Sequence, residues 1–353
     1  MKLFGSPWNV PENIPETEEI DSKKMITGPE RTRESVLNRE ENRMANYKIY
    51  VVGMGPGSVE MMTPQAYNAL ADSDVIVGYT VYLELLTKEF PGRPLLSTPM
   101  RKETERCELC FEIAEKGLAS ADGKAKLHGG EKAKIFRADG YAEDNASALQ
   151  ADGSAKDGAS EEGIDIREAK LPENLAHPKK IAMVCSGDAG VYGMASLMYE
   201  IGKDHPEAEL VIIPGITAAL SGGAVLGSPL SNDFCTISLS DYLTPWERIE
   251  KRLLAAAEGD FSIALYNPSS HKRKDYLQRA CDILLRVLPP ERACGYVENI
   301  GREGTSATVC TLGELRNRQV NMFTTVFIGN STGEIWNGKL LCKRGYPAER
   351  NED

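Results

Sequence analysis

The chain has 353 residues and a formal net charge of −11, and 41% of its residues are hydrophobic. This length allows two domains, each with a core of its own. The acidic balance argues against a nucleic-acid-binding protein, which needs a basic face. The sequence has no run of about 18 apolar residues and begins with a polar segment, so we expect neither a membrane-spanning helix nor a secretory leader. These features predict a cytoplasmic protein.

The eight cysteines are spread along the chain, and we expect them to be reduced thiols. Cys107 and Cys110 form a C-x-x-C pair. A zinc site of this kind would need a second pair, which the sequence lacks. We therefore predict no metal site and interpret the pair as two thiols one turn apart on a helix.

Three segments have compositions that do not favour a packed core. Residues 1–46 are rich in Glu, Asn, Pro and Arg without an apolar period, and we predict a mobile N-terminal tail. Residues 119–178 are mostly Ala, Gly, Asp, Lys and Glu, which predicts a disordered insertion in a surface loop. Residues 347–353 form a short C-terminal tail. The remaining chain has the length of two domains.

Residues 47–225 alternate between strand and helix patterns, which favours a mostly parallel α/β domain. Thr63 is a predicted N-cap with Pro64 at the first helical position, and Gly117 is a predicted helix end. We predict strands at 47–53, 74–79, 180–187 and 208–215 and helices at 63–73, 81–86, 103–117 and 189–203.

Residues 226–346 predict a mixed α+β domain, with the domain boundary near the small residues at 222–229. A capping box is predicted at Thr244-Pro245-Trp246-Glu247, opening a helix that runs to Gly259. We predict strands at 234–241, 261–267, 293–301, 324–330 and 339–346 and a further helix at 274–288.

Four turns of small residues follow predicted apolar strands: 51–57, 184–193, 212–219 and 264–270. In α/β folds such strand ends form ligand sites, so we expect a cleft that holds a flat, polar, adenosine-like ligand against the backbone. The first turn lacks the third glycine of a dinucleotide-binding fingerprint, because Ser58 stands at that position. Pro56 also removes a backbone N–H that a pyrophosphate would need. The turn therefore favours a ligand without phosphates.

The ordered set of motifs G-x-G-P-G, S-G-D-A-G-x-Y-G, P-G-I-T-A, L-Y-N-P and G-R-E-G-T resembles the tetrapyrrole (corrin/porphyrin) methyltransferase family. The branch that methylates C17 of precorrin-3B or cobalt-factor III is the most similar, through the stretches 237–253, 263–273, 298–305 and 327–332. The resemblance covers nearly all of 48–346 except the insertion. Ala189 departs from it, because the family usually has proline there.

The resemblance implies S-adenosylmethionine as cofactor, bound between two α/β domains, and a homodimer. It also implies methylation of a corrin precursor at C17 with contraction of the ring. Glycines allow the backbone to approach such a ligand closely. The residues expected at the cofactor are Gly55, Pro56, Gly57, Gly187, Asp188, Gly190, Val191, Tyr192, Thr217, Ala218, Tyr266, Asn267, Gly304 and Thr305. For Asp188 two other roles stay open, a bond to backbone N–H groups in its turn and the capping of the next helix.

A tetrapyrrole with several carboxylates needs local positive charge in an otherwise acidic protein. The candidate substrate-binding residues are Arg101, Lys102, Lys272, Arg273 and Arg302, and Arg302 is favoured because it lies within a motif. Ring contraction requires proton movement, and Asp241 is the candidate general acid or base, with a turn-capping role as the alternative.

Three other functions stay open on the sequence alone. The chain could be another precorrin or tetrapyrrole methyltransferase of the same superfamily. It could be a nicotinamide-dependent oxidoreductase, against which Pro56 and the missing glycine count. It could also be a non-catalytic interaction protein that acts through its tail and insertion. We expect no nucleic-acid partner.

Overall fold

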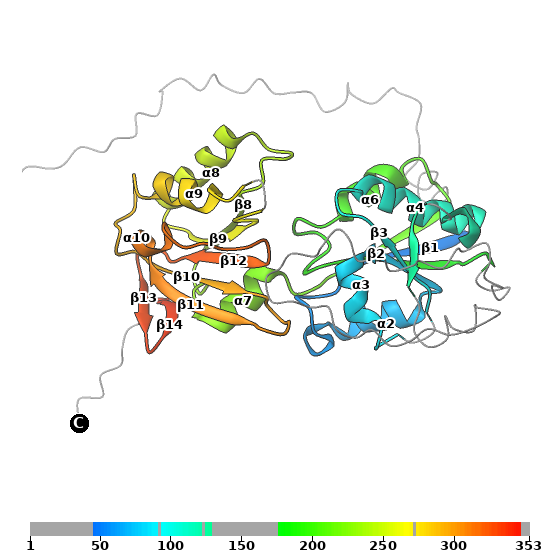
Figure 1. The fold of residues 1–353 in the computed structure, drawn as a ribbon, viewed down its shortest axis with the longest axis horizontal. Helices are drawn as coiled ribbons and strands as arrows, with labels where there is room; N and C mark the ends of the chain where they lie inside the picture. The colour runs from blue at the N-terminus through cyan, green and yellow to red at the C-terminus, as the bar shows by residue number, and fades with distance from the viewer. Residues whose placement is uncertain (1–44, 91–92, 122–123, 129–175, 271–272, 347–353) are drawn as a thin grey trace, which may run out of the picture. The chain divides into compact units, whose positions relative to one another are not determined.

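The computed structural model describes residues 45–90, 93–121, 124–128, 176–270 and 273–346. A first, six-stranded sheet has the order β4-β3-β2-β5-β1-β6 (Figure 1). Its pairings are parallel, except that β4 runs antiparallel to β3. The strands are β1 (Tyr47–Gly53), β2 (Val75–Tyr79), β3 (Leu95–Thr98), β4 (Lys126–His128), β5 (Lys180–Cys185) and β6 (Ala208–Ile213).

Helices cover both faces of this sheet, as expected for parallel strands with long apolar runs. Ile49 and Val51 of β1 pack in one core with α4 (Glu103–Lys116) and α6 (Ala195–Gly202). Val52 of β1 packs in a second core with α2 (Pro64–Asp72) and α3 (Thr80–Leu86). The alternation along β1 thus divides its side chains between the two faces.

Local signals set several boundaries of these helices. Thr63 caps α2, because its hydroxyl accepts a hydrogen bond from the amide of Ala66 at 3.1 Å, and Pro64 is the first helical residue. Gly117 ends α4 with a φ of 91°. Cys107 and Cys110 lie on the buried face of α4, where burial raises the pKa of Cys107 to about 12. In contrast, α6 begins at Ala195 and not at 189, because residues 189–194 form the turn described below.

The second sheet has the order β11-β10-β12-β9-β8. β8 and β9 are parallel, whereas the other pairs are antiparallel. Its strands are β8 (Phe234–Ser238), β9 (Ser262–Tyr266), β10 (Ala293–Glu298), β11 (Ser306–Thr311) and β12 (Thr324–Ile328).

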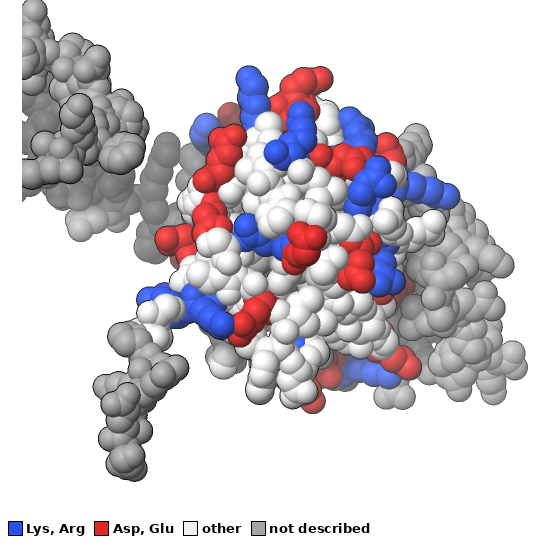
Figure 2. All heavy atoms as spheres, turned by 90° about the vertical axis from the view of Figure 1, so that its left-hand side faces the viewer, with Lys and Arg blue, Asp and Glu red and all other residues white. Residues whose placement is uncertain are grey.

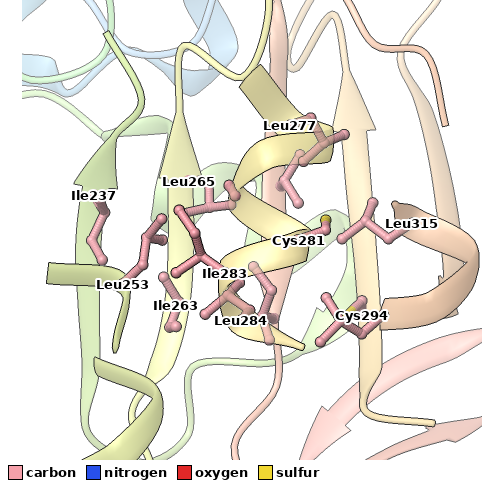
Figure 3. Close-up of a cluster of buried hydrophobic side chains, with 14 of the residues drawn as sticks. Ile237, Leu253, Ile263, Leu265, Leu277, Cys281, Ile283, Leu284, Cys294 and Leu315 are labelled. Atoms are coloured by element: carbon pink, nitrogen blue, oxygen red, sulfur yellow. The ribbon is translucent and has the colours of Figure 1, made fainter. Parts of the chain in front are cut away.

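Helices α8 (Trp246–Glu258), α9 (Tyr276–Leu284) and α10 (Leu312–Leu315) bury one face of the second sheet. Figure 3 shows the resulting core, in which Leu253 of α8 and Leu277 and Cys281 of α9 lie over Ile263 and Leu265 of β9. On the other face, α7 (Ala218–Leu226) packs through Ala219 and Leu226 against β9, β10 and β12. The packing thus places α7 with the second sheet, although the expected boundary at 225 placed it with the first.

A small third sheet joins β13 (Gly333–Trp336), β14 (Lys339–Cys342) and the two-residue strand β7 (Gly227–Ser228). The hairpin between β13 and β14 turns at Asn337 and Gly338, which both have positive φ values, as hairpin turns of this length require. We did not predict β3, β7, β11 or β13 from the sequence. All of these except β11 have four residues or fewer, which leaves little apolar alternation to detect.

Two other local expectations differ from the structure. The predicted capping box at Thr244 is absent: α8 has Pro245 at its N-cap and no side-chain hydrogen bond there. The start of the expected loop insertion contains the end of the short 3-10 helix Leu118–Ala121 and strand β4. Residues 129–175 of that insertion, the tail at 1–44 and the tail at 347–353 lie outside the described residues.

No helix in the described part of the chain has the length and apolar character needed to cross a membrane.

Candidate functional site

Three of the predicted turns lie side by side at one edge of the first sheet. β5, β1 and β6 are adjacent and parallel, so their carboxyl ends meet at the same edge. The amide of Gly55 donates to the carbonyl of Gly187 at 3.0 Å, and the amide of Gly187 donates back to the carbonyl of Gly55 at 2.7 Å. A Cβ on Gly215 would lie 2.1 Å from the carbonyl oxygen of Gly187. Only glycine at 215 permits this approach of the turns.

Asp188 links two of these turns through its carboxylate. Its Oδ1 accepts hydrogen bonds from the amides of Gly190 at 2.8 Å and Val191 at 3.1 Å, and its Oδ2 accepts one from Gly215 at 2.9 Å. Of the roles left open by the sequence, the structure shows the bond to backbone N–H groups. It does not show a helix cap, because α6 begins at Ala195.

The fourth turn, at the end of β9, is tied to the start of α7. The hydroxyl of Tyr266 accepts a hydrogen bond from the amide of Ala219 at 2.8 Å and shares a second with the hydroxyl of Thr217 at 2.6 Å. Burial raises the pKa of this hydroxyl. The ring of Tyr192 lies 5.0 Å from that of Tyr266, centroid to centroid. Asn267 has a φ of 54° and donates from Nδ2 to the hydroxyl of Ser238 at 2.9 Å.

A pocket opens where these turns meet the end of β10 and the start of β12. It brings together residues that are far apart in the sequence. Nine residues of the predicted cofactor and substrate sets line it: Pro56, Gly187, Val191, Tyr192, Thr217, Ala218, Tyr266, Asn267 and Arg302. The sequence did not reveal the other lining residues, which are Tyr82, Ser186, Asn299, Ile300, Met322, Phe323, Thr324 and Thr325. Ser186 and Asn299 lie next to predicted turns in the sequence. Tyr82 and Phe323 lie in no sequence motif that predicts a ligand site.

The other predicted cofactor residues shape turns and do not line the pocket. Gly55 and Asp188 make the backbone bonds described above. Gly190 receives one of them. Gly304 has a φ of 75°, and the hydroxyl of Thr305 donates to the carbonyl oxygens of Asn299 and Arg302, both at 2.7 Å. These bonds hold the turn that presents Arg302.

Gly57 makes room for Arg302. A Cβ on Gly57 would lie 2.8 Å from Cγ of Arg302. The aliphatic part of the arginine therefore packs directly against the backbone of this glycine. The guanidinium carbon lies 4.9 Å from the ring centroid of Phe323 and 5.9 Å from that of Tyr82. Burial lowers the pKa of Arg302. Within the described residues, no carboxylate pairs with it.

The other predicted basic residues lie elsewhere or have partners. Arg101 is exposed, with a φ of 66°. Lys102 pairs with Glu105 at 2.6 Å on α4. Arg273 pairs with Asp241 at 2.7 Å. Lys272 falls outside the described residues. On the face seen in Figure 2, basic and acidic side chains are mixed and neither sign gathers in one field.

Asp241 does not line the pocket. It accepts a hydrogen bond from the hydroxyl of Tyr276 in addition to its ion pair with Arg273. The hydrogen bond from Tyr276 and the charge of Arg273 lower the pKa of its carboxyl, so that Asp241 is ionised at neutral pH. In this state it can accept a proton but cannot donate one.

The pocket offers the kinds of group that the adenosine and amino-acid parts of S-adenosylmethionine would need. The strand-end turns provide close access to the backbone, and Ser186, Thr217 and Asn267 offer hydroxyl and amide groups for polar contacts. Tyr192 and Val191 offer apolar surface for a flat base. When bound, this cofactor supplies a methyl group on a positively charged sulfur. Arg302 is the one charged side chain among the described lining residues, and it suits a ligand with a carboxylate.

Comparisons with known proteins identify the family of the chain. The family model of tetrapyrrole (corrin/porphyrin) methylases matches residues 48–316. A probable cobalt-factor III C(17)-methyltransferase of Salmonella typhimurium is 34% identical over 298 residues, which are 84% of this chain and 98% of that protein. A precorrin-3B C(17)-methyltransferase of Sinorhizobium sp. is 33% identical over 291 residues, 81% of this chain and 90% of that protein.

A cobalt-factor III methyltransferase of Priestia megaterium is 34% identical over 304 residues, 85% of this chain, and the chain spans 45% of that longer protein. Among solved structures, the methyltransferase CobJ is similar, with a TM-score of 0.61 and 28% identity over 84% of this chain and 100% of that one. The expected two-domain α/β fold is thereby confirmed. The chain belongs to the tetrapyrrole (corrin/porphyrin) methylases.

Proposed function

We propose that the chain is an S-adenosylmethionine-dependent methyltransferase of corrin biosynthesis, which methylates C17 of cobalt-factor III or precorrin-3B with contraction of the ring. The observation that carries the proposal is the pocket itself. Four small-residue turns converge on it, and an arginine without a described counterion lines it. The names of the relatives from Salmonella and Sinorhizobium supply the substrate and the position of methylation.

The residues of this chain contribute orientation and exclusion of water. Methyl transfer between two bound reactants gains several kcal/mol, as an order of magnitude, when the reacting atoms are held in line. Asp188 and Tyr266 fix the turns at 187–191 and 217–219, and these turns form one wall of the pocket. Arg302 stands on the wall formed by the turn after β10.

Asp241 serves in this proposal as a base during ring contraction, because its carboxyl is ionised at neutral pH. Its place at the end of β8, close to Tyr276 and Arg273, lies outside the pocket wall. A role in catalysis therefore requires the loop after β8 to bring Asp241 to the bound substrate.

Calorimetric titration with S-adenosylhomocysteine tests the cofactor, with NADH and NADPH as controls. We expect saturable binding of S-adenosylhomocysteine alone. The enzyme is then assayed with cobalt-factor III without oxygen, with precorrin-3B, and with other tetrapyrroles, and the product is read by mass spectrometry for one added methyl group. Methylation of a different tetrapyrrole only would assign the chain to another branch of the family. Binding of NADH or NADPH instead would contradict the proposal.

The finer parts of the proposal are a cytoplasmic location and a homodimer. All eight cysteines are free thiols, and seven of them are buried, which suits a reducing compartment. Ile335 and Trp336 of β13 are exposed apolar side chains on a strand at the edge of its sheet, a surface that a second copy could cover. Sedimentation equilibrium decides the oligomeric state, and fractionation of the source cells decides the location.

A further inference from the structure

Arg302 is a half-buried cation whose charge has no described counterion. The pocket residues include no aspartate or glutamate in the described part of the chain. The influences on its pKa are burial and the neighbouring Tyr82, with no carboxylate among them. Three other arginines of the second sheet's domain have carboxylate partners: Arg273 pairs with Asp241, Arg286 with Glu250 and Arg316 with Asp282. A partly buried guanidinium group that no described carboxylate neutralises is able to bind an anionic group of a ligand.

The surroundings of Arg302 fix its direction but do not satisfy its N–H groups. Gly57 admits the aliphatic part of the side chain, because a Cβ there would lie 2.8 Å from Cγ. The rings of Tyr82 and Phe323 contact the guanidinium group, at 5.9 and 4.9 Å from their centroids. Aromatic faces stabilise the cation and leave its N–H donors free for an acceptor.

We propose, on the basis of the function proposed above, that Arg302 binds a carboxylate of a pocket ligand through its guanidinium fork, and that Gly57 is the positioning residue that keeps its side chain directed there. A carboxylate matches the fork at two points. Two ligands carry one: the cofactor, at its amino-acid end, and the tetrapyrrole, at its peripheral side chains. The role is therefore that of a carboxylate receptor, and the experiment identifies its source.

The first arm compares two probes of the cofactor site in the full chain. S-Adenosylhomocysteine carries the amino-acid carboxylate, whereas methylthioadenosine has the same nucleoside and sulfur without it. If the carboxylate is that of the cofactor, Arg302→Met raises the Kd for S-adenosylhomocysteine about tenfold or more. The Kd for methylthioadenosine then changes by no more than about twofold. Arg252→Met, at an exposed position on α8, is the matched control for loss of one positive charge. We expect its affinities for both probes to equal those of the wild type.

The second arm measures methyl transfer to cobalt-factor III. If the carboxylate is that of the tetrapyrrole, Arg302→Met leaves S-adenosylhomocysteine binding unchanged and raises KM for the tetrapyrrole about tenfold or more. Arg302→Lys keeps the positive charge but cannot bind a carboxylate through two parallel hydrogen bonds. We therefore expect it to show a smaller loss than Arg302→Met in the same quantity, either the Kd for S-adenosylhomocysteine or the KM for the tetrapyrrole. Gly57→Ala keeps the guanidinium group but places a Cβ 2.8 Å from both Cγ of Arg302 and the carbonyl oxygen of Gly301. It therefore displaces Arg302, and we expect it to raise the same quantity as Arg302→Met does.

The outcomes separate the two proposals. If Arg302→Met and Arg302→Lys change neither arm, or if Arg302→Met weakens methylthioadenosine as much as S-adenosylhomocysteine, Arg302 is not a carboxylate receptor. If the wild-type chain binds neither probe, the proposed function fails before Arg302 is at issue. Circular dichroism of each variant tests whether it is folded. If Arg302→Met is unfolded, the test rests on Arg302→Lys and Gly57→Ala. Wild-type probe affinity and wild-type KM in both variants would overturn the inference.

Discussion

The carboxylate of Asp188 accepts a hydrogen bond from the amide of Gly215 at 2.9 Å, which joins the turn after β5 to the turn after β6. The same carboxylate also holds the amides of Gly190 and Val191. The turn at 187–191 and the turn that leads to Thr217, which together form one wall of the pocket, are thus joined by one side chain. The first prediction follows from this link.

Asp188→Asn replaces one acceptor oxygen by an NH₂ group that cannot accept a hydrogen bond from an amide. We expect the free energy of unfolding to fall by about 1.5–3 kcal/mol, the range for hydrogen bonds to a charged group, and S-adenosylhomocysteine affinity to fall as well. Chemical denaturation and calorimetry measure both. Asp204→Asn, at an exposed position after α6, is the control and should change neither. Unaltered affinity in Asp188→Asn would mean that the turns hold without this carboxylate.

Tyr266→Phe removes only the hydroxyl that bonds with Thr217 and the amide of Ala219. The partly buried amide then has no partner at the start of α7, so we expect a loss of about 1–2 kcal/mol in the free energy of unfolding and weaker cofactor binding. Tyr192→Phe is the matched control. Its hydroxyl makes one bond of 3.3 Å to Thr236 at an exposed site, and its loss should have little effect on stability. Equal losses in the two variants would argue against a special role for Tyr266.

Two threonines that precede prolines provide a paired test of helix capping. Thr63 caps α2 and also donates to the carbonyl of Pro214 at 3.3 Å, whereas Thr244 makes no cap bond to α8. We expect Thr63→Ala to cost about 1 kcal/mol in the free energy of unfolding, the typical value for a lost N-cap. We expect Thr244→Ala to cost close to nothing. Urea titration of both variants measures the difference, and a reversed order would contradict the capping assignment.

Asp241 should affect catalysis and acid stability, but not cofactor binding. The hydrogen bond from Tyr276 and the charge of Arg273 lower its pKa below the ordinary value of 3.8. A carboxyl whose pKa is lowered by folding stabilises the fold at pH values above its pKa in the unfolded chain. This contribution is lost as the pH falls through its pKa in the folded protein. Asp241→Asn should therefore lose stability near neutral pH and converge with the wild type in strong acid.

The catalytic part of this prediction is a slower ring contraction in Asp241→Asn, with S-adenosylhomocysteine affinity unchanged. Turnover of cobalt-factor III and calorimetric titration measure the two quantities. Asp275→Asn, which lies next to Tyr276 without an ion pair among the described contacts, is the control. Turnover equal to that of the wild type would remove Asp241 from the mechanism and leave it as a partner of Arg273.

The parts of the structure that depend on neighbours in the sequence could be predicted. Thr63-Pro64 and Gly117 mark helix ends through bonds within a few residues, and the four glycine-rich or asparagine turns follow apolar runs that form strands. The resemblance placed these turns at a cofactor site. The pocket then gathers most of the residues expected in the second to fourth turns.

The parts that depend on distant contacts could not be predicted. The bond from Gly215 to Asp188 and the fit of Arg302 across Gly57 join residues that only the folded chain brings together. Likewise, Arg273 and Arg302 are the same residue type, yet Arg273 pairs with a carboxylate and Arg302 has no carboxylate partner among the residues that the structure describes. Helix α7 follows the first domain in sequence but packs on the second sheet, because its apolar face meets Phe327 and Val297 there.

The position of β5 in the first sheet has a consequence for how the chain folds. β5 lies between β1 and β2, so Lys48 pairs with Lys180 and Val75 with Ile181. The two earlier strands cannot meet their shared neighbour until the ribosome has released residues beyond 185. Closing so large a loop costs entropy before any pairing compensates for it, and non-local pairing of this kind slows folding. The segment at 129–175, which separates β4 from β5 in the sequence, therefore sets the length of that loop, and shortening it should speed refolding.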